Sequence, residues 1–227
     1  MNWNGLELPE AYYQDESVYI INSDCREVLP QLSKVDLAWT DAPYNVGKDY
    51  GVWNDSLPDD EYLSFCSNWI GELKRLSDEL VISLPRKYAL QYWQMLGQEY
   101  HQIILPWTPE GAIRNGFINQ FASLLTNAKP KQRTKDVWYK VQMRGMGYFF
   151  KENDYGHPGY TSEDVTDRVI MAFTLSGQLI LDPFLGSGTT AYCAKKLNRL
   201  CIGIEIEERY AEIAAKRCSQ SVMRLES

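Results

Sequence analysis

Two short segments of the chain carry side chains that could act on a small organic group. The first is the tetrapeptide Asp41-Ala42-Pro43-Tyr44, which follows a buried-looking apolar run. An amine attached to an aromatic ring is a poor nucleophile, because its lone pair is delocalised. The Asp41 carboxylate and the Ala42 carbonyl could accept both N–H hydrogens and localise that lone pair. Pro43 would stiffen the turn, and Tyr44 would offer a ring face for stacking.

The second segment, LDPFLGSGTT at 181–190, predicts a strand, a glycine turn and a helix that begins near Thr189. Gly186-Ser187-Gly188 would let a ligand approach the backbone, and the helix start offers unpaired N–H groups. Glu205 lies about 17 residues beyond Gly188, near where dinucleotide folds place a ribose-binding acid. The segment therefore predicts a site for a nucleotide-like ligand.

The type of ligand follows from what the glycine turn lacks. A phosphate-binding loop needs a lysine where this chain has Thr189, and the nicotinamide fingerprint needs a third glycine where it has Ala191. Acidic residues on both sides, Asp182 and Glu205, suit a donor with a cationic sulfonium and ammonium. We therefore expect S-adenosylmethionine (SAM) as cofactor, and methyl transfer as the reaction.

Short apolar runs alternate with helical patterns, which predicts a mostly parallel sheet with helices on both faces. The expected strands are Val18–Asn22, Val35–Thr40, Leu80–Leu84, Gln102–Trp107, Leu179–Asp182 and Cys201–Glu205. The expected helices are Asp59–Leu76, Arg86–Leu96, Glu163–Phe173, Thr189–Leu197 and Glu207–Cys218. Phe117–Thr126 and Val137–Lys140 are expected as antiparallel strands at the sheet edge, separated by a projecting loop.

Composition narrows the class of protein. The 227 residues, 44% of them hydrophobic, are enough for one domain with a substantial core. The five cysteines are scattered and form no C-x-x-C pair, so we expect free thiols and no zinc site. The sequence shows neither a secretory signal nor a membrane-spanning run. We expect a cytoplasmic protein with no membrane partner.

Charge is unevenly distributed along the chain. Between Lys129 and Lys151 there are seven Lys or Arg residues and one Asp, a local charge of +6, which leaves −13 for the rest of a chain whose net charge is −7. A basic segment in an acidic chain is typical of a protein that binds phosphates with one face of its surface. A solvated run of charges is an equal alternative. The expected DNA-binding residues are Lys129, Lys131, Arg133 and Lys135.

These blocks together resemble the β-class amino methyltransferases of DNA, in which the catalytic motif precedes the SAM motif. The resemblance runs through SDCREVLPQL, VDLAWTDAPYNVGKDYGVWND, DVWYKV, HPGYTSEDVTDRVIMAF and LDPFLGSGTTAYCAKKLNRLCIGIEIEERYAEIAAKR. It implies a Rossmann-like SAM-dependent methyltransferase fold, with residues 1–227 forming a single methyltransferase domain. It also implies base flipping, DNA methylation and a place in restriction–modification.

The resemblance also assigns roles to residues. The tetrapeptide from Asp41 to Tyr44 would hold the target amine and base. Asp24 would contact the adenine edge of SAM, although it could instead simply cap a following helix. Glu205 would bind the ribose. The remaining cofactor-binding residues expected are Asp182, Phe184, Gly186, Ser187, Gly188, Thr189 and His157.

Three departures from the family pattern affect these expectations. Ala42 stands where the family usually has proline, which predicts a looser turn with its carbonyl intact. Gly159-Tyr160 replaces the usual continuation of the His157-Pro158 segment. Only about 126–155 remains as a target-recognition insert, and base readout generally needs several side chains in a groove. We therefore expect recognition that is loose, that concerns a short site or that requires a second subunit, and a homodimer is a further expectation.

An aspartate at the first position of the tetrapeptide usually accompanies adenine in this family. Asp41 therefore predicts transfer to the adenine N6 amine of DNA. Both adenine and cytosine present an exocyclic amine, so cytosine N4 stays open as an alternative. Methyl transfer to RNA or to a free base would need the same two motifs, and a catalytically silent SAM-dependent regulator is a further alternative.

Overall fold

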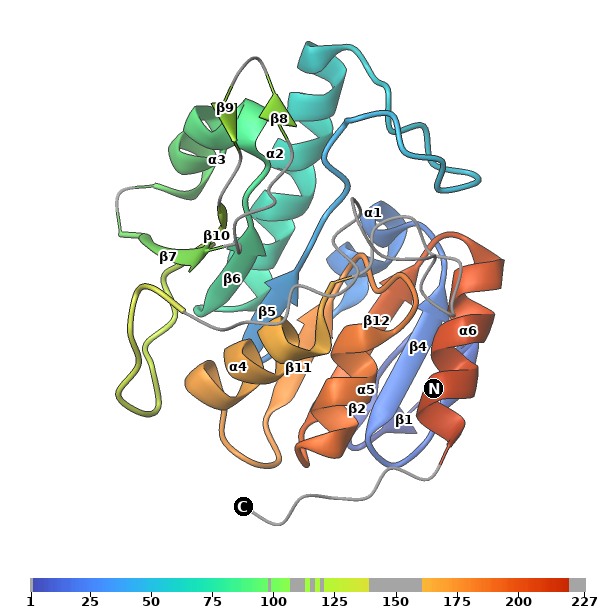
Figure 1. The fold of residues 1–227 in the computed structure, drawn as a ribbon. Coiled ribbons are helices and arrows are strands. Elements are labelled where there is room, and N and C mark those ends of the chain that lie inside the picture. Colours follow the sequence, from blue (N-terminus) through green and yellow to red (C-terminus); the bar gives the residue numbers. More distant parts are fainter. Residues whose placement is uncertain are drawn as a thin grey trace.

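An eight-stranded sheet organises the molecule (Figure 1). The computed structural model describes residues 2–97, 99–106, 113–114, 117–118, 121–138 and 161–220. The strand order is β3-β4-β12-β11-β5-β6-β10-β7. The strands are β3 (Tyr13–Gln14), β4 (Val18–Asn22), β5 (Leu37–Thr40), β6 (Leu80–Ser83), β7 (His101–Pro106), β10 (Phe121–Thr126), β11 (Leu179–Asp182) and β12 (Leu200–Glu205).

The five central strands are parallel, as the continuous apolar runs predict for strands covered on both faces. β12 pairs in parallel with β4 and β11, and β5 with β11 and β6. β10 runs antiparallel between β6 and β7, which confirms the expected antiparallel hairpin at the edge. Two short hairpins lie outside this sheet, β1 (Asn2–Trp3) with β2 (Leu6–Glu7) and β8 (Ile113–Arg114) with β9 (Phe117–Ile118).

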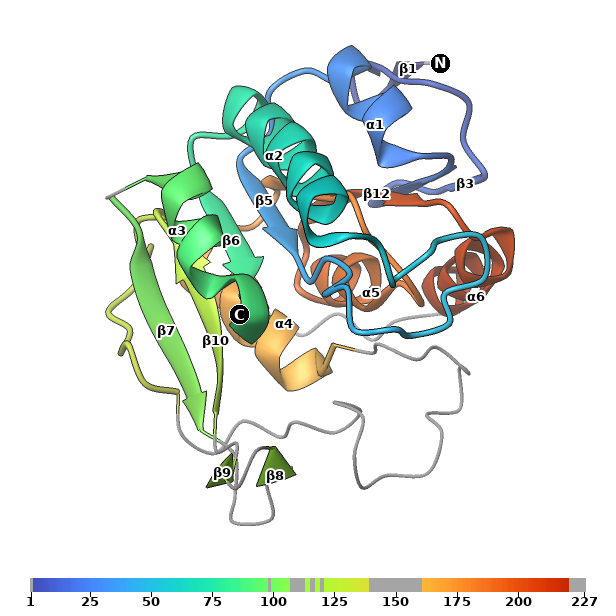
Figure 2. The same ribbon diagram turned by 90° about the horizontal axis from the view of Figure 1, so that it is seen from above.

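Helices cover both faces of the sheet (Figure 2). One face carries α1 (Cys25–Val28), η1 (Leu29–Gln31), α2 (Asp59–Leu76), η2 (Arg86–Tyr88) and α3 (Ala89–Leu96). The other carries α4 (Glu163–Phe173), α5 (Thr189–Lys196) and α6 (Glu208–Ser219). None of the described helices is long and apolar enough to cross a membrane.

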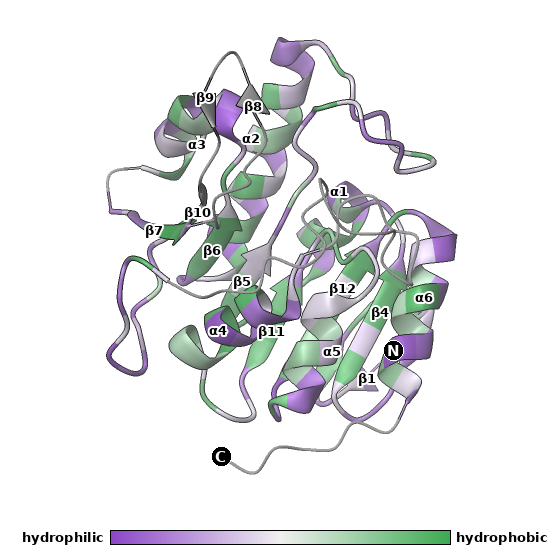
Figure 3. Ribbon diagram, in the orientation of Figure 1, coloured by the Kyte–Doolittle hydropathy of each residue, from purple (hydrophilic) through white to green (hydrophobic). Residues whose placement is uncertain are grey.

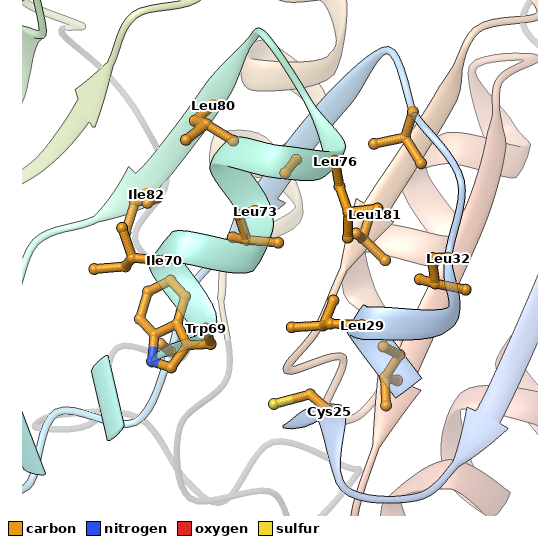
Figure 4. Close-up of a cluster of buried hydrophobic side chains, with 14 of the residues drawn as sticks. Cys25, Leu29, Leu32, Trp69, Ile70, Leu73, Leu76, Leu80, Ile82 and Leu181 are labelled. Atoms are coloured by element: carbon orange, nitrogen blue, oxygen red, sulfur yellow. The ribbon is translucent and has the colours of Figure 1, made fainter. Parts of the chain in front are cut away.

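Two hydrophobic clusters fill the space between the sheet and these helices. Along β4, Val18 and Ile20 join the cluster under α4–α6, while Tyr19 and Ile21 join the cluster under α1–α3. This alternation is the period of a strand buried on both faces. Figure 3 shows hydrophobic strands at the centre. Figure 4 shows Trp69, Ile70 and Leu73 of α2 packed toward Leu80, Ile82 and Leu181 of the sheet.

The expected edge segment is only partly regular. Phe117–Thr126, predicted as one strand, contains β9 and β10 as separate strands. Val137–Lys140 is not a strand within its described residues, because Val137 makes only an isolated bridge to Ile104. Residues 139 and 140 lie outside the described residues, as does most of the expected 126–155 insert.

Candidate functional site

The predicted site residues gather at one edge of the sheet. Asp41 follows β5, Asp182 ends β11 and Glu205 ends β12, and these parallel strands are neighbours. Asp24 follows β4, the next strand along. Because carboxyl ends of parallel strands share an edge, segments that are far apart in sequence meet here. All four carboxylates line one pocket, together with Gly186, Ser187 and Thr189 of the glycine turn.

Asp182 connects the two chemical segments. Its Oδ1 accepts hydrogen bonds from Thr40 Oγ1 (2.9 Å) and the Phe184 N–H (3.1 Å), and its Oδ2 accepts one from Thr190 Oγ1 (2.6 Å). Burial raises the pKa of this carboxyl to about 6, against the opposing effect of those donors. Since Thr40 directly precedes Asp41, Asp182 fixes the turn formed by residues 41–44, which we call the Asp41 turn, relative to the glycine turn. The sequence predicted a cofactor contact at Asp182 and missed this anchoring.

The glycine turn closes on Glu205. The Gly186 N–H donates to Glu205 Oε2 (2.8 Å), and the Glu207 N–H donates to Oε1 (2.8 Å). Burial raises the pKa of Glu205 to about 7. Each carboxylate oxygen keeps a further lone pair that could accept a ligand hydroxyl. Glu205 therefore has the chemistry expected for a ribose contact.

Gly188 illustrates why the turn needs glycine. Its φ is +84°, a left-handed conformation, and a Cβ there would lie 2.6 Å from the Ala214 Cβ of α6. The turn is also fixed by Arg217, which the sequence analysis missed. Arg217 Nη1 donates to the Ser187 carbonyl (2.8 Å), and Nη2 bonds Glu163 Oε1 at the start of α4 (3.0 Å). The sequence gave no sign of this role, because Arg217 is simply a basic residue in the last turn of the expected helix Glu207–Cys218.

The Asp41 turn has a defined network of hydroxyl groups. The Tyr44 hydroxyl donates to Asp41 Oδ1 (2.7 Å), and Thr161 Oγ1 donates to Asp41 Oδ2 (2.8 Å). Tyr44 also bonds the Ser83 hydroxyl at the end of β6. Burial, with the neighbouring Asp41, raises the pKa of Tyr44 well above its ordinary value. The hydroxyl of Tyr44 is thus fixed in a network, a contact not anticipated for a ring predicted to stack on a base.

The other two members of the tetrapeptide keep the turn in place. Ala42 is buried in the cluster under α1–α3. The Pro43 carbonyl accepts a hydrogen bond from the Tyr62 hydroxyl of α2 (2.8 Å). This tie to a long helix supplies rigidity to a turn that was expected to be loose because of Ala42.

Residues 45–57 form a strap that crosses from the Asp41 turn toward α6. Buried Asp55 accepts from the N–H groups of Asn45, Val46 and Lys48 at 2.8–3.0 Å. The Val52 N–H donates to Glu207 Oε2 (3.0 Å). The strap adds Tyr50 and Trp53 to the pocket lining. Asn45, Gly47 and Gly51 are residue types that favour turns. They do not predict the path of the strap across the pocket.

The pocket lining fits SAM better than a phosphate-bearing ligand. None of the described lining residues is Lys or Arg, and the acids are Asp24, Asp41, Asp182 and Glu205. Apolar walls come from Phe65, Phe184, Trp53, Ile204 and Ile206. A ligand with positive charge and a flat purine matches acids and aromatic walls, whereas the four carboxylates of this lining would repel a pyrophosphate. This fold and pocket define a cofactor-dependent transferase of the SAM class.

Asp24 makes the helix-cap contact that was the alternative to cofactor binding. Its side chain accepts from the Arg26 N–H (2.9 Å) as the N-cap of α1, and it pairs with the Arg26 guanidinium. It also lines the pocket. An adenine contact stays a prediction, and it would share the carboxylate with these donors.

Among the predicted residues, Ala42, Tyr44 and Gly188 belong to the two turns but do not line the pocket. Two further predicted groups are not brought near it by the described structure. His157 lies outside the described residues. The basic loop, which we define as Lys129, Lys131, Arg133 and Lys135, follows β10, and this antiparallel strand carries the chain to the amino edge of the sheet. There Lys131 pairs with Glu79, the residue before β6 (2.9 Å). The loop lies at the opposite edge from Asp41 (Figure 1), a position that argues against contact with the target base.

The chain belongs to the N6/N4 family of DNA methylases, whose model matches residues 35–89 and 91–216. The type II methyltransferase M.BglII of Bacillus subtilis is 46% identical over 257 residues, covering 91% of this chain and 70% of that protein. The solved M1.HpyAVI–SAM complex has a TM-score of 0.63 at 23% identity, covering 89% of this chain and 100% of that one. The cytosine-N4-specific PvuII methyltransferase has a TM-score of 0.68 at 13% identity, covering 94% and 90%.

The family confirms the expected class: the protein is a SAM-dependent DNA amino methyltransferase with a Rossmann-like fold. SAM supplies an electrophilic methyl group on a sulfonium. The protein supplies the acidic, aromatic pocket and the Asp41 turn beside it.

Proposed function

We propose that the protein methylates the exocyclic N6 amine of an adenine flipped out of duplex DNA. The observation that carries this proposal is the position of Asp41, which lines the same pocket as the glycine turn and Glu205. A base within a duplex cannot reach such a pocket, so it must leave the stack. The choice of adenine is supported by the aspartate that begins the tetrapeptide.

The Asp41 turn supplies acceptors and a proton sink in this proposal. Asp41 accepts a hydrogen bond from the amine, which localises the lone pair on nitrogen. Transfer would break the S–C bond of the sulfonium as the N–C bond forms, so that the positive charge moves from sulfur to nitrogen. The Asp41 carboxylate would stabilise this charge before taking the released proton. Fixed groups of this kind act mainly by alignment and by preorganised charge. The Tyr44 ring and Pro43 would hold the base.

Cytosine N4 is the second candidate, because the family includes both acceptors and the PvuII enzyme is cytosine-N4-specific. Methylated duplex DNA should be digested to nucleosides and analysed by mass spectrometry, with Asp41→Ala as the inactive control. We expect 6-methyladenine from the wild type and neither product from the variant. Detection of 4-methylcytosine without 6-methyladenine would reverse the choice of base.

Three further expectations stay proposals. We expect duplex DNA to outcompete RNA in a tritiated-SAM transfer assay. The type II name of the B. subtilis relative supports a role beside a restriction nuclease. A homodimer would be tested by light scattering on the purified protein with and without DNA.

A further inference from the structure

We propose that Thr161 is a positioning residue that fixes the Asp41 carboxylate for methyl transfer. Thr161 Oγ1 donates to Asp41 Oδ2 at 2.8 Å, across 120 positions of sequence. Both residues line the pocket. This inference rests on the proposed role of Asp41 as the acceptor of the target amine, and it holds for either base.

A free aspartate would not hold its carboxylate in one orientation. The terminal torsion of an aspartate is broad and nearly two-fold, so the plane of the oxygens needs external partners. Here each oxygen has one: the Tyr44 hydroxyl at Oδ1 (2.7 Å) and the Thr161 hydroxyl at Oδ2 (2.8 Å). Each oxygen keeps a second lone pair that can accept from the amine. The two hydroxyls therefore orient the carboxylate without consuming its capacity to accept.

The donor directions around Asp41 are determined. Tyr44 has a single hydroxyl hydrogen, which it donates to Asp41, so the Ser83 hydroxyl must donate to the Tyr44 oxygen. Ser83 is buried at the end of β6. The Tyr44 side of the carboxylate is therefore supported by the sheet itself.

On the side of Thr161, the Asp41 carboxylate is supported by elements that also hold the glycine turn. Thr161 comes just before Ser162 and α4, and Glu163 in the first turn of α4 bonds Arg217 (3.0 Å). Arg217 in turn donates to the Ser187 carbonyl of the glycine turn (2.8 Å). Thr161 is thus held by the element that also holds the methyl-donor site. It links the position of the acceptor carboxylate to that of the glycine turn.

The test compares two variants that differ in one group. Thr161→Val keeps the branched shape and removes the hydroxyl, whereas Thr161→Ser keeps the hydroxyl and removes a methyl. Loss of a hydrogen bond to a charged group should lower the single-turnover methyl-transfer rate about 10- to 100-fold in Thr161→Val. Thr161→Ser should recover most of that rate. The dissociation constant for SAM, measured calorimetrically, and the melting temperature should change little in both variants.

The outcomes separate this inference from the proposed function. Absence of transfer to DNA by the wild type would remove the proposed function, whichever variant is examined. With an active wild type, a normal rate in Thr161→Val overturns the positioning role. An equally slow Thr161→Ser overturns it too, because the hydroxyl would then be irrelevant. Loss of SAM binding or of melting temperature in step with the rate would show a structural role instead.

Discussion

Single carboxylates determine how the cofactor pocket responds to pH. Glu205 accepts from two backbone N–H groups, yet burial still raises its pKa to about 7. A raised pKa means that the folded protein without ligand loses stability as the pH rises through about 7, because a buried charge forms. In the role proposed for Glu205, the ribose hydroxyls of SAM would bind this same charged form of the carboxyl. Stability of the free protein and affinity for SAM should therefore change in opposite directions.

We predict that the affinity for SAM rises about tenfold between pH 6 and pH 8, following the ionised fraction of a group with a pKa near 7. Calorimetric titrations with SAM across this range would measure it. Glu205→Gln should bind SAM weakly and nearly independently of pH. Glu212→Gln, a change on the exposed face of α6, should retain the wild-type profile. A pH-dependent Glu205→Gln would assign the dependence to another group, such as Asp182.

Residue-level prediction from sequence succeeded where local pattern and chemistry coincide. Asp41 and Gly186 follow recognisable apolar strands and Glu205 ends one, and the structure places all three at one pocket. Thr161 and Arg217 were missed because their partners lie 120 and 30 positions away. The local sequence does not distinguish a hydroxyl that donates a hydrogen bond to a distant carboxylate from a hydroxyl that is bonded to water.

At the scale of elements, the accuracy of the strand and helix predictions followed segment length and periodicity. Asp59–Leu76 was predicted to the residue, because three acids at its start and a long apolar face leave few alternatives. α1 is only four residues long and has no periodicity to detect, so the sequence indicated a cap at Asp24 but no extent. The β1–β2 hairpin, with two residues in each strand, escaped for the same reason.

The contact between α5 and α6 gives a prediction at this scale. Gly188→Ala places a methyl group against Ala214, in a left-handed conformation, at the start of α5. Backbone strain should cost about 1–2 kcal/mol, and overpacking should add roughly 1–3 kcal/mol. Gly177→Ala is the matched control, because its φ of +81° is nearly the same and no atom lies within 4 Å of the new Cβ.

Urea unfolding of both variants separates the two contributions. Gly177→Ala should lose only the backbone part of the unfolding free energy, and Gly188→Ala should lose more. Equal losses would mean that α6 moves aside, and that close helix packing does not constrain the glycine turn.

For the molecule as a whole, strand direction decides which surface can face DNA. The sequence showed a run of basic residues. It did not show at which edge of the sheet they lie, because their position depends on β10 running antiparallel to β6. The pocket lies at the carboxyl edge and the basic loop at the amino edge. The four residues of β6 alone separate these edges by roughly 13 Å. Charge patterning favoured contact with a polyanion and a solvated charge run equally, and it could not place the basic loop on the fold.

The strap, by contrast, places exposed Lys48 on the pocket side of the sheet. We predict that Lys48→Ala weakens duplex binding and reduces the slope of log affinity against log salt by about one. Arg133→Ala combined with Lys135→Ala should leave affinity within about twofold and the slope unchanged, because these side chains lie at the far edge. Fluorescence anisotropy over a potassium chloride series measures both. A larger loss in the double variant would mean that DNA wraps around to the amino edge, and would restore the basic loop as a phosphate contact.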